Sequence, residues 1–209
     1  MEGEWMSHNG ITTDTPTRLL FGAGVYFANV TYDEKIAPTL EAIKAALIGA
    51  TQEGGTLTIT PEFYIPPIDG ALVPVLELRR KVGETAQMEV SFAEFTADLA
   101  AKMVIGKVSE STDGKYDVIT SADLAPEHFY QGFGFYGNLM DGRPVIIIFK
   151  NALCTSGFTT NPTNKENAVF KGTFECHSDI AYGTTRLPYA IFVHKSEGWT
   201  PATVDELAA

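Results

Sequence analysis

Cysteine, positive charge and long apolar runs are all scarce in this sequence. Its 209 residues include two cysteines, Cys154 and Cys176, which are too few for a disulfide framework. Cys176 falls on the apolar side of its strand pattern, so a buried free thiol is expected there. No apolar run approaches the ~20 residues of a membrane span. The acidic start, Met-Glu-Gly-Glu-Trp-Met, lacks the basic and apolar regions of a secretory signal, which favours synthesis in a cytoplasm.

The balance of charge argues against a nucleic-acid-binding protein. Lys and Arg total 15 against 26 Asp and Glu, which gives a formal net charge of −11. Affinity for a phosphate backbone comes from clustered Lys and Arg, and such clusters are nearly absent.

Motifs for catalysis or metal binding are also missing. The four histidines, at positions 8, 128, 177 and 194, show no metal-ligand spacing with another ligand on a helix. Neither cysteine lies in a nucleophile motif, and Gly22-Ala-Gly24 is only a fragment of a dinucleotide fingerprint. We therefore predict no catalytic, cofactor-binding or metal-binding residues, and we expect a structural protein and not an enzyme.

The residues that are abundant favour strands joined by tight turns. The chain has 13 Phe, 8 Tyr, 19 Gly and 11 Pro. Alternating or apolar runs predict strands over 24–30, 56–60, 128–139, 144–149, 169–177 and 189–193. Asp141-Gly142 predicts a hairpin between two of them. Val145 to Phe149 is apolar on both faces, so we expect both faces to be covered.

One segment changes from a strand period to a helix period. Met88, Val90 and Phe92 alternate with polar residues, and a helix near 91–105 is predicted to follow. Ser91 and Glu94 have the spacing of a capping box, and Gly106 is expected to end the helix. Its core face is expected to be Phe95, Leu99 and Met103. A shorter helix is predicted near 38–48, so the chain as a whole is expected to be mainly β (α+β).

Residues 65–74 are both proline-rich and apolar. Prolines exclude a central strand, and the apolar residues make a solvated loop awkward. Two interpretations stay open: an arm that docks on a neighbouring molecule, or an ordered loop over its own core. The domain prediction is an N-terminal arm over 1–20, a single β domain over 21–195 and an acidic tail over 196–209.

Several strings in the sequence resemble the major tail (tail tube) proteins of tailed bacteriophages. They are residues 49–62 (Gly-Ala-Thr-Gln-Glu-Gly-Gly-Thr-Leu-Thr-Ile-Thr-Pro-Glu), 69–71 (Asp-Gly-Ala), the strand-and-helix segment, 149–157 (Phe-Lys-Asn-Ala-Leu-Cys-Thr-Ser-Gly), 170–179 (Phe-Lys-Gly-Thr-Phe-Glu-Cys-His-Ser-Asp) and 187–192 (Leu-Pro-Tyr-Ala-Ile-Phe). The resemblance covers roughly residues 22 to 193 and rests on a pattern of short strings without one diagnostic motif.

The resemblance implies a fold and an assembly. It implies two packed antiparallel sheets (β-sandwich or barrel-like) with a flanking helix, in copies that form hexameric rings. These rings would stack into a virion tail tube that conducts DNA without binding it specifically, through an acidic lumen. Val145 to Phe149 would then be covered from both directions by strands shared between subunits. Assembly would take place in the host bacterial cytoplasm, with the tail terminator, tape-measure and baseplate or tip proteins as further partners. No cofactor is implied.

The long loop of that family bridges subunits or rings, and it matches this chain's proline-rich segment. The candidate inter-subunit residues are Pro66, Pro67, Ile68, Leu72, Val73, Pro74, Arg79, Arg80 and Lys81. The last three form the densest basic cluster, and they are read either as a contact with an acidic patch on the next ring or as a solvated turn.

Three alternatives remain. A β-sandwich carbohydrate-binding or adhesion module would use Tyr130, Tyr136 and the loop 155–167 as its face. A small β-rich enzyme would need a polar cluster that the sequence does not show. Within the tail interpretation, the tube of a bacteriocin or another phage-like particle is a further alternative.

Overall fold

The computed structural model describes residue 15 and residues 19–70, 73–160, 162, 164 and 167–195. The predicted N-terminal arm lies almost wholly, and the acidic tail wholly, outside these residues. The elements in chain order are β1 (Leu20–Phe27), α2 (Leu40–Ala45), β2 (Thr51–Tyr64), η2 (Leu76–Leu78), β3 (Arg80–Phe92), α3 (Ala97–Val104), β4 (Gly106–Glu110), β5 (Asp117–Ser121), η3 (Pro126–His128), β6 (Tyr130–Leu139), β7 (Pro144–Cys154), β8 (Thr159–Thr160), β9 (Phe170–Cys176) and β10 (Tyr189–Val193).

The fold is mainly β, as predicted, and the described residues form one large antiparallel sheet, a small second sheet and two α-helices of more than one turn. The large sheet has the order β1-β6-β7-β9-β3-β2, with β10 on β7 and β8 on β9. The strand β7 pairs with β6 along one edge, while β10 and β9 follow one another along the other edge. The predicted hairpin at Asp141-Gly142 is confirmed, and it joins β6 to β7. The small sheet is the β4–β5 hairpin.

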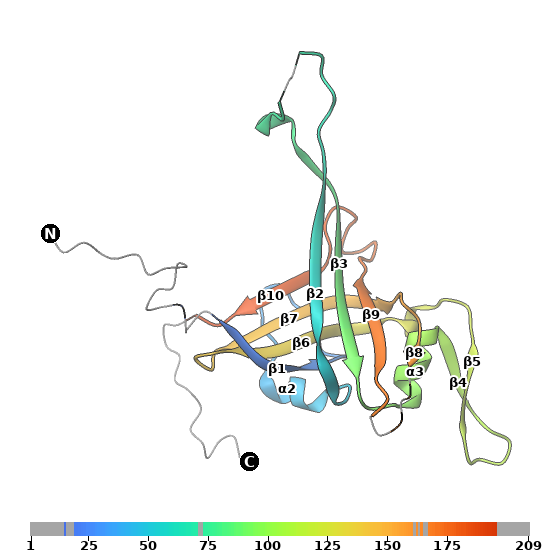
Figure 1. Cartoon of the computed structure of the whole chain (residues 1–209). Helices are drawn as coiled ribbons and strands as arrows, with labels where there is room; N and C mark the ends of the chain where they lie inside the picture. The colour runs from blue at the N-terminus through green and yellow to red at the C-terminus, as the bar shows by residue number, and fades with distance from the viewer. Residues whose placement is uncertain are drawn as a thin grey trace.

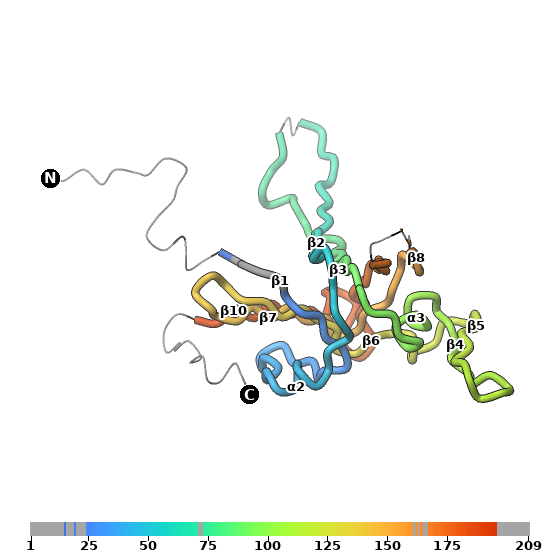
Figure 2. The backbone as a smooth tube through the Cα atoms, turned by 60° about the horizontal axis from the view of Figure 1, so that its bottom comes forward, coloured from blue at the N-terminus to red at the C-terminus, as the bar shows by residue number. Residues whose placement is uncertain are grey.

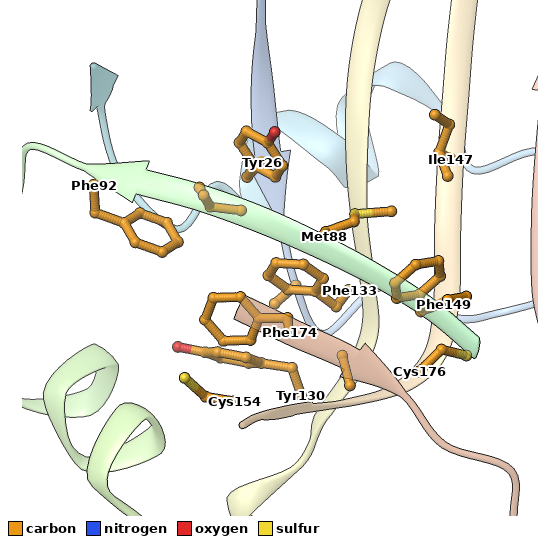
Figure 3. Close-up of a cluster of buried hydrophobic side chains, with 14 of the residues drawn as sticks. Tyr26, Met88, Phe92, Tyr130, Phe133, Ile147, Phe149, Cys154, Phe174 and Cys176 are labelled. Atoms are coloured by element: carbon orange, nitrogen blue, oxygen red, sulfur yellow. The ribbon is translucent and has the colours of Figure 1, made fainter. Parts of the chain in front are cut away.

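The main core lies between two parts of the large sheet that cross steeply. In Figure 1 the strands β1, β6, β7 and β10 run from side to side, whereas β2, β3 and β9 run from top to bottom. Aromatic and sulfur-containing side chains from both parts meet between them, as Figure 3 shows. The rings of Phe133 on β6 and Phe174 on β9 stack with their centroids 4.5 Å apart. The two predicted packed layers are thus parts of one continuous sheet.

The strand β7 is covered on both faces by its own chain. Val145, Ile147 and Phe149 face the main core, while Ile146 and Ile148 join a second cluster with Phe27, Val30 and Ile43. Ile43 lies on α2, so the segment between β1 and β2 supplies this second cover. The prediction that both faces are covered is confirmed. The expectation that a neighbouring subunit's strands supply the cover is wrong, because a short helix of the same chain does so.

The helix predicted near 91–105 begins later than expected. It is α3, and its N-cap is Thr96, whose hydroxyl accepts a hydrogen bond from the Leu99 amide at 3.2 Å. Ser91 lies inside β3, so the capping box assigned to it is wrong. Leu99 and Met103 are buried as predicted, but Phe95 precedes the helix and is 54% exposed. Phe95 is therefore not part of the core face.

The ends of both helices also differ in detail from the expectation. The left-handed residue that ends α3 is Ile105, with φ of 53°, and Gly106 begins β4. A Cβ on Gly106 would lie 2.8 Å from Ile119, so that glycine serves close packing against β5. The shorter helix predicted near 38–48 is α2, which covers six residues after its N-cap Thr39.

Candidate functional site

The ends of β2 and β3 form a long projection from the body of the molecule. We call residues 61–83 the arm: the outer ends of the two strands and the connection between them, which includes η2. The hairpin pairs in one register from Gly55↔Val90 to Glu62↔Gly83, and after a shift of register it pairs again at Phe63↔Lys81 and Tyr64↔Arg80. Figures 1 and 2 both show the arm extending far beyond the labelled strands and helices of the body. The paired strands therefore hold the connecting loop away from the core.

The arm carries apolar side chains that its own chain leaves in water. Val73 is 69% exposed and Leu76 is 85% exposed. The other large apolar side chains exposed on the arm are Phe63, Tyr64, Ile65, Ile68 and Val82. Among the predicted inter-subunit residues, Leu72 lies outside the described residues, and the others lie on the arm as the sequence places them. Exposed apolar side chains gathered on one projection are typical of an interaction site.

The three basic residues of the arm have different surroundings. The Arg79 guanidinium lies 4.3 Å from the centre of the Phe63 ring, and Lys81 forms an ion pair with Glu84 at 2.6 Å. Among the described residues, Arg80 has neither an ion-pair partner nor an aromatic ring beneath it. It is therefore the cation of this cluster that remains available to another molecule.

Glu84 anchors the base of the arm to the body. The Tyr189 hydroxyl on β10 donates a hydrogen bond to its carboxylate at 3.1 Å, alongside the Lys81 ion pair. Burial raises the pKa of Glu84, but the hydrogen bonds from Lys81 and Tyr189 outweigh it, and the net pKa lies below its usual value. The carboxylate thus stays ionised where the arm meets the sheet.

The outer face of β2, β3 and β9 is polar throughout. Cross-strand rows place Thr56 beside Glu89 and Thr173, and Thr58 beside Gln87 and Glu175. The full set, which we call the polar face, is Thr56, Thr58, Thr60, Thr85, Gln87, Glu89, Ser91, Lys171, Thr173 and Glu175. Lys171, its one cation, pairs with Glu53 at 3.0 Å on the surface. The face is therefore hydroxyl-rich and net acidic.

The long strand β2 has an open edge. It ends the order of the large sheet, and in the described part of the chain no strand pairs with its outer side. Unpaired amide and carbonyl groups on such an edge form a template for pairing with another chain.

The chemistry-bearing side chains elsewhere have structural surroundings. Cys154 and Cys176 are free and buried, which confirms the predicted buried thiol. Burial raises the pKa of Cys176 to about 12, so its thiolate is scarcely populated at neutral pH. The buried His128 uses Nδ1 to accept a hydrogen bond from the Ala125 amide at 2.9 Å. Within the described ranges no three His, Cys, Asp or Glu side chains group as metal ligands do. The same ranges contain no helix long and apolar enough to cross a membrane.

The aromatic face expected for a carbohydrate-binding module does not form. Tyr130 is 2% exposed and packs against Phe133 and Phe174 in the main core. Tyr136 packs against the second cluster, with Ile146 and Ile148. The two tyrosines therefore do not present a shared surface to a sugar ring.

Three phenylalanines form a surface cluster that no pattern in the sequence predicted. Phe95, Phe158 and Phe170 contact one another, with ring centroids 5.0 to 5.8 Å apart. Phe158 is the lone aromatic residue of a polar loop, and this was the feature of the sequence that could have marked it as a surface contact residue. It could not be joined to the other two until β9 was placed beside β3.

Comparisons with known proteins found little. Neither a scan of protein-family models nor a search of curated proteins gave a match. Among solved structures, the chain is similar to one from the "virion of native gene transfer agent (GTA) particle". The identity is 11%, the match covers 75% of this chain and 92% of that chain, and the TM-score is 0.34. A likeness of that degree assigns neither a fold nor a function to this chain.

Proposed function

We propose that this chain is a structural virion protein that assembles into hexameric rings, stacked as a tail tube through which DNA passes. The observation that carries the proposal is the arm. Its apolar side chains are held away from the two hydrophobic clusters that the described part of the chain forms. Burying apolar surface contributes about 25 cal/mol per Å², so a second molecule that covers the arm gains stability that the isolated chain lacks.

The open edge of β2 supports ring formation. Sheet edges that pair between copies satisfy the backbone groups that one copy leaves open. Six copies related by rotation would close such contacts into a ring, because a head-to-tail interface whose rotation closes leaves no free ends.

The polar face supports a role as the wall of a DNA conduit. Hydroxyl and carboxylate groups dominate it, and its one lysine is already paired. Adhesion of DNA depends on the release of counterions by Lys and Arg side chains, so this surface offers the duplex little to bind. The proposal also includes the tail terminator, tape-measure and baseplate or tip proteins as partners. The tube of a phage-like particle or a bacteriocin is the same assembly in another setting.

Electron microscopy of the purified protein tests the proposal directly. Negative staining of concentrated wild-type protein is expected to show hollow rods or six-fold rings. Deletion of residues 66–74 is expected to leave a folded monomer with an unchanged urea midpoint and no rods. The matched control is Ile180→Ser, which changes a residue that is 94% exposed on the body. Wild-type protein that stays monomeric at every concentration would contradict the proposal, and rods from the deletion would remove the arm from it.

A further inference from the structure

The three surface phenylalanines form a compact aromatic site at the edge of the main core. Phe95 follows β3, Phe158 lies between β7 and β8, and Phe170 begins β9. Phe170 packs against the main core, whereas Phe95 and Phe158 are exposed. We call these three residues the aromatic cluster. Its rings are fixed by mutual contact, so a partner that covers them loses little side-chain freedom.

The aromatic cluster and the arm lie at opposite ends of one strand. Arg80 begins β3 at the arm, and Phe95 follows its other end three residues after Phe92. Thirteen residues at about 3.3 Å each separate the two sites by roughly 40 Å. Figure 1 shows the arm at one end of β3 and α3 at the other. The arm of one copy therefore cannot reach the aromatic cluster of the same copy.

An unpaired cation on the arm and unpaired carboxylates beside the aromatic cluster are opposite in sign, although the arm also carries the exposed carboxylates of Glu62, Asp69 and Glu77. Glu94 and Asp98 flank Phe95 in sequence, and both are exposed. Neither has an ion-pair partner among the described residues. On the arm, Arg80 is the cation without a partner, and it follows Leu76 by four residues. Complementary charges of this kind orient an encounter and fix its register.

We propose that the aromatic cluster is the docking site for the arm of a second copy of this chain. Val73 and Leu76 cover the rings of Phe95 and Phe158, and Arg80 approaches Glu94. The contact is head-to-tail, since each copy offers an arm at one end and an aromatic cluster at the other. Such a contact repeats along an axis until one of the surfaces is missing. The inference rests on the proposed function and identifies the surface that receives the arm.

Photo-crosslinking in the full-length chain tests the contact. A benzophenone amino acid replaces Leu76, and the protein is mixed with an isotope-labelled wild-type chain before irradiation. Mass spectrometry is expected to find mixed-isotope crosslinks at and around Phe95, Phe158 and Phe170. The matched control places the same group at Tyr116, which is 68% exposed on the β4–β5 hairpin. It is expected to leave those residues unlabelled.

Substitutions in the receiving copy sharpen the test. Phe95→Ser with Phe158→Ser is expected to lower the crosslink yield at least about tenfold, as removal of interface anchors does. Arg80→Glu on the arm is expected to lower it about fivefold at low salt, and Glu94→Arg in the receiving copy is expected to restore it. Urea midpoints of all variants establish that they remain folded.

The outcomes separate this inference from the tube proposal. Crosslinks at the aromatic cluster in protein that forms no rings or rods support the head-to-tail contact and contradict the tube. Rods whose crosslinks map to another surface overturn the inference and leave the tube proposal standing. If the labelled copies form neither crosslinks nor rods, both are wrong.

Discussion

The two halves of the β2–β3 hairpin use similar residues for opposite purposes. In the body half, Ala86, Met88, Val90 and Phe92 alternate inward and are buried, opposite polar residues on the outer face. In the arm half, Phe63 and Val82 are exposed, although Phe63 still pairs with Lys81 in the same hairpin. The difference is what lies beside the hairpin: β9 and β6 in one half, and nothing from the described chain in the other. Apolar character alone therefore does not determine burial.

The largest contrast is expected between two phenylalanines of this hairpin. Phe92 is fully buried and meets Phe174 edge-on, whereas Phe63 is about half exposed beneath Arg79. Phe92→Ala is expected to cost about 3–5 kcal/mol of unfolding free energy, and Phe63→Ala less than about 0.5 kcal/mol. Urea denaturation of both variants measures the difference. Equal losses would mean that the arm is part of the cooperative core.

Two glycines give a second, smaller contrast. A Cβ on Gly55 in the body half would lie 1.9 Å from the Tyr26 hydroxyl and 2.5 Å from the Glu89 carbonyl oxygen. A Cβ on Gly83 in the arm half would meet only the Glu62 side chain, which can move. Gly55→Ala is expected to cost about 1–3 kcal/mol through overpacking. Gly83→Ala is expected to stay within about 0.5 kcal/mol of the wild type, because alanine suits a strand at least as well. Thermal unfolding of both variants checks the order.

A third contrast concerns the point where β3 gives way to α3. Thr96→Ala is expected to cost about 1 kcal/mol, because the Leu99 amide loses its cap. Ser91→Ala is expected to change stability by less than about 0.5 kcal/mol, since Ser91 lies on the outer face of β3. Chemical denaturation distinguishes the two. A larger loss from Ser91→Ala would restore the earlier helix start.

The smallest effect is expected where the two halves meet, at Glu84. Its folded-state pKa lies below its usual 4.5, so its interactions with Lys81 and Tyr189 stabilise the fold above that pH. This stabilisation is lost as the pH falls through the folded-state pKa. We therefore expect wild type and Glu84→Gln to differ most above pH 4.5 and to converge as the pH falls below the folded-state pKa of Glu84. Urea midpoints across this range test the expectation, and a constant difference would contradict it.

Local patterns in the sequence predicted much of the fold, and non-local pairing decided the rest. Alternation located most strands of the large sheet but not β4, β5 or β8, and Asp141-Gly142 located a hairpin. The predicted start of α3 was wrong because Ser91 and Glu94 have the spacing of a capping box without forming one. Phe92 pairs with both Thr51 and Phe170, and this pairing extends β3 past Ser91. These partners lie 41 and 78 residues away, beyond any local signal. The exposure of Phe95 follows from the same extension.

The candidate sites divide in the same way. Prolines and apolar residues marked the arm from the sequence alone, because few strands or solvated loops have that composition. The sequence predicted the polar face only in part. The alternation within each strand shows which of its residues are polar, but only the strand order β9-β3-β2 places their acidic and hydroxyl side chains together. The aromatic cluster brings together residues from three separate parts of the chain, and no regular spacing in the sequence predicts it.

The direction of the arm has a mechanical consequence. The arm continues the axes of β2 and β3, and the hydrogen bonds of an antiparallel ladder run perpendicular to its strands. Tension applied at the arm tip pulls β2 and β3 together and loads the ladder between β3 and β9 in shear, so that the bonds of that ladder resist together instead of opening one after another. Single-molecule pulling should find a high rupture force along the arm and a low one when β10 is peeled sideways from β7. A chain joined to its neighbours through this arm would bend or twist at its joints before it came apart.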